Sequence, residues 1–289
     1  MLRLHVLAFT LVILFAPALA EASAIKIIAA ENFYGDIASQ IGGANVKVKS
    51  VLNNPSQDPH LFEASPSLAR DLAEADLVIF NGVDYDPWME KLLAATPSSK
   101  RKVIVAAEVA GRKAGDNPHL WYDFAVSKAV AKAVAENLSV ARPAQAEYFK
   151  KQEVAFEQAL GDLQGEVQKI ARAHGGTSVA ATEPVFGYML ESMGLDVREK
   201  RFQLAVMNDA EPAVSDVAQF EDDLKGHVVK LLIYNKQATD PVADKLLALA
   251  EAQNIPVVAV TETQPEGTSF QQWLSGEIGA VAKALENTH

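Results

Sequence analysis

Short runs of β-branched and aliphatic residues alternate with amphipathic segments along the chain from Ala24 onward. Such alternation is typical of βα units that build a parallel sheet. The first series predicts strands at 25–30, 46–52, 77–81 and 102–107, and helices at 33–41 and 66–75. A second series begins after Thr177 and predicts strands at 178–181, 231–234 and 257–260, and helices at 186–193, 214–224, 241–252 and 270–285. The pattern therefore predicts an α/β protein with two lobes, each built on a central, mostly parallel sheet.

A long stretch between the two series has the spacing of a single helix. Residues 144–173 contain no Pro, and their main apolar positions step by 4, 3, 4 and 3: Phe156, Leu160, Leu163, Val167 and Ile170. This spacing forms one apolar stripe along a helix. A helix of about 30 residues spans about 45 Å, so we expect a strut that limits hinge motion between the lobes. The alternative is two ordinary helices that break near Gly161 or Gly165.

The first two dozen residues have the pattern of a secretory signal peptide. Arg3 supplies the positive start, residues 6–15 are apolar apart from one Thr, and small residues follow at cleavage spacing. Cleavage is predicted after Ala20 or Ala24, and the apolar run is shorter than the roughly 20 residues that span a bilayer. The predicted divisions are a signal peptide at 1–24, an N-terminal lobe at 25–143, a connecting helix at 144–174 and a C-terminal lobe at 175–289. We expect an exported, periplasmic monomer.

Composition and missing motifs narrow the chemistry. The 289 residues include 26 Lys and Arg against 37 Asp and Glu, a formal net charge of −11, so nucleic acid is not an expected partner. The chain has no Cys, which excludes disulfides, thiolate metal ligands and a lipid-modified N-terminal Cys. It also lacks the glycine-rich nucleotide loops, the Gly-x-Ser-x-Gly elbow and the His-Glu-x-x-His motif of common nucleotide-binding proteins, hydrolases and zinc proteases.

Two histidines share a local pattern that favours a common site. They lie in Asp58-Pro59-His60-Leu61-Phe62 and Asn117-Pro118-His119-Leu120-Trp121, which are 59 residues apart. The preceding Pro restricts the backbone, so each imidazole would project from a stiff loop. Both loops follow predicted strands, and sites in open α/β sheets form beyond the carboxyl ends of strands. The alternative is two loop histidines that hydrogen-bond backbone carbonyl groups.

Two acids of the second lobe occupy similar positions. Glu183 follows the predicted strand 178–181, and Glu262 follows the predicted strand 257–260. An isolated acid at such a position is more often solvated or caps a helix. Together with His60 and His119, however, these acids would supply two neutral nitrogens and two anionic oxygens, which balance a divalent cation.

At these residues the chain resembles the solute-binding proteins of metal-ion ABC transporters, the zinc and manganese family. The matching stretches are Asp58-Pro59-His60 with Pro66-Ser67, Ala75 to Gly82, Pro87-Trp88, Asn117 to Trp121, Phe186-Gly187-Tyr188 and Asn254 to Val257. The resemblance implies two α/β lobes joined by one long helix, with a metal ion bound in the cleft and handed to a membrane permease. It implies no catalytic activity.

The resemblance also implies the metal ligands. His60 and His119 match the first two ligands by position, Glu183 falls where the family places His or Glu, and Glu262 falls where Asp is more common. Asn235 and Asp240 are nearby alternatives to Glu262 as the fourth ligand. Leu68 departs from the family pattern, because an acid or amide usually follows Pro-Ser; we expect only an altered helix start.

The identity of the ion and the class of protein both have rivals. A carboxylate at 183 and the absence of a His-rich loop place Mn²⁺ slightly ahead, although Zn²⁺ normally binds more tightly at a given N/O site. One rival class is a secreted metallohydrolase that uses Glu183 or Glu262 as general base. Another is a receptor for a metal chelate, with a cleft lined by aromatic residues: Tyr34, Tyr85, Trp88 and Tyr122.

Overall fold

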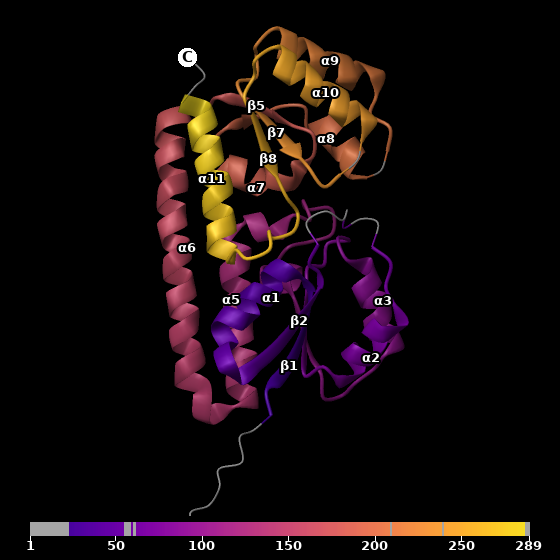
Figure 1. Ribbon diagram of the computed structural model, residues 1–289, viewed down its shortest axis with the longest axis vertical. Helices are drawn as coiled ribbons and strands as arrows, with labels where there is room; N and C mark the ends of the chain where they lie inside the picture. Colours follow the sequence, from indigo (N-terminus) through magenta and orange to yellow (C-terminus); the bar gives the residue numbers. More distant parts are fainter. Residues whose placement is uncertain (1–22, 55–58, 60–61, 209, 239, 287–289) are drawn as a thin grey trace, which may run out of the picture.

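The computed structural model describes residues 23–54, 59, 62–208, 210–238 and 240–286. Figure 1 shows two α/β lobes stacked along the long axis of the molecule, with the helix α6 (Ala146–His174) beside both. Residues 1–22 of the predicted signal peptide and the predicted ligand His60 lie outside the described residues. Within the described residues, no helix is both long enough and apolar enough to cross a membrane.

The N-terminal lobe contains a parallel sheet with strand order β2-β1-β3-β4. Its elements, in which η marks a short 3-10 helix, are β1 (Ile25–Glu31), α1 (Asn32–Gly42), η1 (Gly43–Asn45), β2 (Val46–Leu52), α2 (Pro66–Glu74), β3 (Leu77–Phe80), α3 (Pro87–Ala95), β4 (Lys102–Val105), α4 (Ala106–Val109), η3 (Leu120–Tyr122) and α5 (Phe124–Ala141). All four strands fall within the predicted ranges, except that β1 extends one residue further to Glu31. Because the strands are parallel, their carboxyl ends meet at one edge, where the loops with candidate site residues begin.

The connecting helix α6 follows η4 (Pro143–Gln145) and runs unbroken through Gly161 and Gly165. The single-helix prediction is therefore confirmed, and the predicted break is wrong. The apolar stripe from Phe156 to Ile170 is buried against α5, α11 (Phe270–Glu286) and α1. Both glycines face open space, so the helix passes them without a packing requirement. Burial of the stripe holds this long helix in place.

The C-terminal lobe repeats the strand arrangement of the first, with order β6-β5-β7-β8 and parallel pairing throughout. Its elements are β5 (Ser178–Ala181), η5 (Pro184–Phe186), α7 (Gly187–Ser192), β6 (Asp196–Val197), α8 (Lys200–Met207), α9 (Val214–Lys225), β7 (Leu232–Asn235), α10 (Pro241–Ala252), β8 (Val257–Val260) and α11. The third strand of each sheet in chain order, β3 or β7, lies between the first and the fourth. Side chains at its carboxyl end are therefore flanked by those of both neighbours.

Several elements are absent from the sequence prediction, and α5 is the longest of them. Its sequence is rich in Ala and Val, and residues on several of its turns are buried between the N-terminal sheet and α6. An Ala-rich helix shows little contrast between a polar and an apolar face, so periodicity gives a weak signal there. Asp123 caps this helix by accepting a hydrogen bond from the Ala125 N–H at 2.8 Å.

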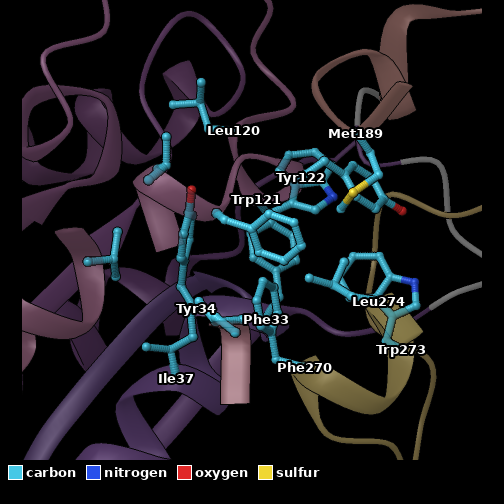
Figure 2. Close-up of a cluster of buried hydrophobic side chains, with 14 of the residues drawn as sticks. Phe33, Tyr34, Ile37, Leu120, Trp121, Tyr122, Met189, Phe270, Trp273 and Leu274 are labelled. Carbon is cyan, nitrogen blue, oxygen red and sulfur yellow. The ribbon is translucent and has the colours of Figure 1, made fainter. Parts of the chain in front are cut away.

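An aromatic cluster joins the two lobes at the carboxyl ends of their sheets. Figure 2 shows the rings of Phe33, Trp121, Tyr122 and Trp273 gathered together. Phe33 of α1 lies 4.6 Å from Trp121 and 5.9 Å from Trp273 of α11, measured between ring centroids. Such ring pairs contribute about 0.5–1.5 kcal/mol each beyond their burial. The lobes thus share a packed core beside α6.

Candidate metal centre

His119 projects from the loop that leads into η3 and is completely buried. Its Nδ1 atom lies 2.7 Å from the side-chain oxygen of Asn117, which also accepts the His119 backbone N–H at 3.1 Å. An amide oxygen can only accept, so Nδ1 carries a hydrogen, and in the neutral imidazole Nε2 carries the lone pair. Such a hydrogen bond fixes the tautomer and the ring orientation that a metal ligand requires.

Asn117 also connects this histidine to the other lobe. Its side-chain NH₂ donates to the backbone carbonyl oxygen of Pro184 at 2.7 Å. Its backbone carbonyl oxygen accepts a hydrogen bond from the hydroxyl of Tyr188 at 2.8 Å. Pro184 is the residue after Glu183. The position of His119 is therefore coupled through one Asn to the segment that carries Glu183.

Glu183 and Glu262 are both buried at the carboxyl edge of the second sheet. Between them lies Asn235, the last residue of β7. Its side-chain NH₂ donates to Glu183 Oε2 at 2.8 Å and to Glu262 Oε1 at 2.7 Å. The amide thus uses both of its hydrogens to hold two carboxylates, each of which acts as an acceptor.

The two lobes meet at Glu262. His119 Nε2 lies 3.6 Å from Glu262 Oε2, and the Tyr85 hydroxyl donates to the same oxygen at 3.0 Å. From within its own lobe, the Gln237 side-chain oxygen accepts the backbone N–H of Glu262 at 2.7 Å. One N-terminal imidazole and one C-terminal carboxylate are therefore adjacent in a buried space.

Tyr85 follows three successive residues with left-handed backbone: Gly82 at φ 78°, Val83 at φ 54° and Asp84 at φ 58°. A β-branched residue rarely adopts this conformation, which costs on the order of 1–3 kcal/mol. Asp86 stabilises the turn, because its carboxylate accepts the backbone N–H groups of Asn81 at 2.6 Å and Gly82 at 2.8 Å. This strained turn carries Tyr85 to Glu262.

A second acid pair lies behind this turn. Glu31, at the end of β1, is fully buried, and no N–H or hydroxyl group of the described residues donates to it. The nearby Asp86 carboxyl adds an electrostatic cost to ionising Glu31 in this buried position. Burial raises the pKa of Glu31 well above its ordinary value and raises the pKa of Asp86 to about 6. Asp86 thus holds the turn, and the buried Glu31 beside it favours its neutral form.

Three of the four predicted ligands, His119, Glu183 and Glu262, are thus linked by direct proximity or through Asn235. Within the described part of the chain, no three His, Cys, Asp or Glu side chains are close enough together to form a preformed metal cluster. His60 lies outside those residues, so its position stays a prediction. Of the two alternative fourth ligands, Asn235 is in the site, whereas Asp240 caps α10 by accepting hydrogen bonds from Val242 and Ala243.

Three of the four aromatic residues predicted to line a cleft for a metal chelate are buried in the described part of the chain. Tyr34 and Tyr122 are fully buried in the core, and Tyr85 is 6% exposed. A pocket of about 250 Å³ does lie between the lobes beside Tyr85, lined by Val83 and Pro118 from one lobe and by Leu204 and Met207 of α8 from the other. Its walls include one aromatic side chain, so it differs from the predicted chelate site.

Fold and site together define a two-lobed α/β receptor, with one long connecting helix and buried nitrogen and oxygen donors at the junction. The chain belongs to the ZnuA family, described as zinc-uptake complex component A, periplasmic, whose family model matches residues 27–284. The resemblance stated from the sequence is therefore confirmed.

Individual relatives are distant but cover nearly the whole chain. The manganese-binding lipoprotein MntA of Bacillus subtilis strain 168 is 23% identical over 279 residues, which cover 91% of this chain and 90% of that protein. The periplasmic zinc-binding protein TroA from Treponema pallidum has a similar structure, with a TM-score of 0.77 at 19% identity over 91% of this chain and 99% of that one. The SBP FpvC from Pseudomonas aeruginosa, solved in complex with Mn²⁺, gives a TM-score of 0.75 at 18% identity over 92% and 100%. These likenesses confirm the predicted fold class.

Proposed function

We propose that this protein captures a divalent transition-metal ion between its lobes and delivers it to the membrane permease of an ABC transporter. The observation that carries the proposal is the approach of His119 Nε2 to Glu262 Oε2, from opposite lobes, at 3.6 Å in a buried site. Ligand atoms around a tetrahedral ion with bonds of about 2.0–2.1 Å are about 3.3 Å apart. A small movement of either lobe would bring both atoms to one ion.

In this proposal, His60, His119, Glu183 and Glu262 are the ligands. The Asn235 amide and the Tyr85 hydroxyl donate hydrogen bonds to carboxylate oxygens of Glu183 and Glu262. A bound cation would replace these donors as the partner of those oxygens. Four protein donors leave little room for a bound water, and an open position is what distinguishes catalytic sites from sites that only hold an ion. The expected behaviour is capture without turnover.

The ion itself is proposed from the donor set and from the relatives. Two carboxylates favour Mn²⁺, whereas the order of affinities at N/O sites favours Zn²⁺. Among the relatives, MntA is named for manganese, TroA for zinc, and FpvC was solved with Mn²⁺. We infer Mn²⁺ slightly ahead of Zn²⁺, a periplasmic location from the family description, and a monomer in solution.

Calorimetric titration with Mn²⁺ and Zn²⁺ tests the site. His60→Ala and His119→Ala should each lower the affinity by about 100-fold or more, which corresponds to about 2.7 kcal/mol. His174→Ala is the matched control, because this residue ends α6 away from the junction, and it should leave the affinity unchanged. Unchanged affinity in both site variants would remove the proposed site. Metal analysis of protein purified without added metal, followed by competition between the two ions, then identifies the cargo.

A further inference from the structure

Glu277 is a carboxyl on α11 that is 8% exposed and is not among the proposed ligands. Its Oε1 atom accepts the Trp273 indole N–H at 2.9 Å and the backbone N–H of Thr261 at 3.1 Å. Its Oε2 atom lies 2.7 Å from the hydroxyl oxygen of Tyr122. One side chain thus contacts both the residue before Glu262 and the 3-10 helix that follows His119.

A count of hydrogens shows the charge state of Glu277. The Tyr122 hydroxyl oxygen is 2.6 Å from the carbonyl oxygen of Thr261 as well as 2.7 Å from Glu277 Oε2. Both contacts are short enough to require a hydrogen, and a carbonyl oxygen supplies none. Burial raises the pKa of Tyr122 far above its ordinary value, so the phenol keeps its single hydrogen and no more. The second hydrogen must come from Glu277, which is therefore a neutral carboxylic acid.

The surroundings of Glu277 agree with this assignment. Burial raises its pKa to about 8, against the opposing effect of its hydrogen-bond donors and of the Lys236 ammonium, the charged group that acts on it from the turn after β7. The buried residues of α6 from Phe156 to Ile170 are apolar, and Asp36 of α1 accepts the N–H of Phe270, two helical turns away from Glu277. The nearby Glu262 carboxylate contributes to the raised pKa of Tyr122. Around neutral pH, the acid form is thus the one that this pocket stabilises.

We propose that Glu277 is a positioning residue of the metal site, whose neutral form locks the backbone before Glu262 to the helical turn after His119. The chain of hydrogen bonds runs from the Glu277 acid to the Tyr122 oxygen and from the Tyr122 hydroxyl to Thr261. Thr261 is thereby held at both its N–H and its carbonyl oxygen. This inference rests on the proposed function, because the residues that Glu277 orients are His119 and Glu262.

Glu277→Gln separates positioning from charge. Glutamine keeps one acceptor oxygen for Trp273 and Thr261 and one NH₂ donor for Tyr122 at every pH, so it copies the neutral acid. Its affinity for Mn²⁺ or Zn²⁺, measured in a competing chelator buffer at pH 7, should stay within about threefold of the wild-type value. Glu277→Ala should weaken binding about ten- to a hundredfold, the range typical for groups that orient ligands. If Glu277→Ala does not fold, Tyr122→Phe takes its place, because it removes the same connection.

The pH profile gives a readout that a purely structural role would not change. Above about pH 8 the wild-type acid loses its proton and can no longer donate to Tyr122, so by pH 9 its affinity should fall several-fold below that of Glu277→Gln; at pH 6.5 the two should agree. Glu153→Gln, at a buried Glu of α6 that pairs with Lys150, is the matched control and should follow the wild type. A wild-type affinity above that of Glu277→Gln at pH 9 would overturn the proposal, because it would mean that the carboxylate charge assists binding.

The metal-free protein tests the proton directly. The infrared difference spectrum between wild type and Glu277→Gln at pH 6.5 should contain the band of one protonated carboxyl, and its absence would contradict the neutral acid. The two proposals can fail separately. If the wild type binds neither ion, the proposed function fails. If the wild type and His119→Ala behave as proposed while Glu277→Ala binds normally, only the role of Glu277 is lost.

Discussion

The two lobes have the same strand order and place similar residues at the same topological positions. A buried acid lies at or just past the carboxyl end of the first strand in each lobe: Glu31 is the last residue of β1, and Glu183 is two residues beyond β5. Each acid has a second carboxyl nearby, Asp86 and Glu262 respectively. The lobes differ in what lies between the members of each pair.

In the N-terminal lobe, no group of the described residues donates to Glu31, and Asp86 accepts two backbone N–H groups. In the C-terminal lobe, the Asn235 amide donates one hydrogen to each carboxylate. A buried acid that no donor contacts favours its neutral form, whereas a pair held by a neutral donor can offer two anionic oxygens to a cation. The Asn235 amide is therefore the feature that distinguishes the acid pair that can hold a metal from the pair that supports a loop.

The strongest test of this difference replaces acids of both lobes one at a time. Glu183→Gln and Glu262→Gln should each lower Mn²⁺ or Zn²⁺ affinity by about 100-fold, or about 2.7 kcal/mol, because each removes a proposed anionic ligand. Glu31→Gln should change the affinity by less than about threefold, since its carboxyl takes no part in coordination. Titration calorimetry of the three variants gives the comparison. Equal losses in both lobes would show that the two pairs do not differ in the way described.

The bridging amide gives a smaller, intermediate effect. Asn235→Ala leaves Glu183 and Glu262 without their common donor, so the two carboxylates repel each other and lose their orientation. We expect affinity to fall about tenfold, at the lower end of the range for groups that orient ligands. Asn137→Ala, in which the lost amide only contacts a carbonyl within α5, is the control. An affinity equal to the wild type would show that the carboxylates are positioned without Asn235.

The N-terminal acid pair should appear in stability instead of in binding. The pKa of Glu31 in the folded protein is raised well above 4.5, so between its ordinary and its raised pKa the folded state binds a proton that the unfolded state lacks. Stability from this group therefore falls as pH rises through that window, and Glu31→Gln removes the loss. The variant should match the wild type near pH 4 and be more stable by about 1 kcal/mol at pH 8. Denaturant unfolding at both values measures this, and a constant difference between variant and wild type would contradict it.

The same kind of substitution at the other acid of the pair should have the opposite effect and provides the control. Asp86→Asn leaves one amide oxygen to accept the two backbone N–H groups that Asp86 now holds, at Asn81 and Gly82. We expect a loss of stability of about 1–3 kcal/mol, the usual cost of an unsatisfied buried donor. Stabilisation by Glu31→Gln together with destabilisation by Asp86→Asn would show that the cost of ionising Glu31 is separate from the support that Asp86 gives the turn.

The two lobes and the long helix could be predicted from the sequence, because alternating strands and helices and the stripe of α6 are local patterns; strand ends and Pro-restricted loops likewise singled out His119, Glu183 and Glu262 as candidate ligands. Sequence reasoning named Asn235 only as an alternative ligand. The role of Asn235 as a bridge depends on sheet order: β7 lies between β5 and β8, and this brings it beside acids 52 and 27 residues away. The partnership of Tyr122 with Glu277, 155 residues apart, likewise depends on how the lobes pack. Spacing along the chain carries no signal for such contacts.

The smallest expected effect concerns α6, the element that the lobes share. An Ala Cβ at Gly161 would meet no atom within 4 Å, and Ala is favoured over Gly inside a helix by about 0.5–1 kcal/mol. Gly161→Ala should therefore stabilise the protein by that amount and leave metal affinity unchanged. Denaturant unfolding and calorimetric titration of the same samples check both expectations.

The contrasting glycine lies in the turn that carries Tyr85. Gly82 has φ 78°, and an added Cβ would lie 2.8 Å from a methyl group of Val105, so Gly82→Ala should destabilise the protein and disturb the Tyr85 contact with Glu262. If Gly161→Ala instead lowered the affinity, bending of α6 at this glycine would be part of metal capture, and the lobes could not be treated as two halves held apart by a rigid strut. Unchanged affinity would place the movement that admits the ion in the loops at the carboxyl edges of the two sheets.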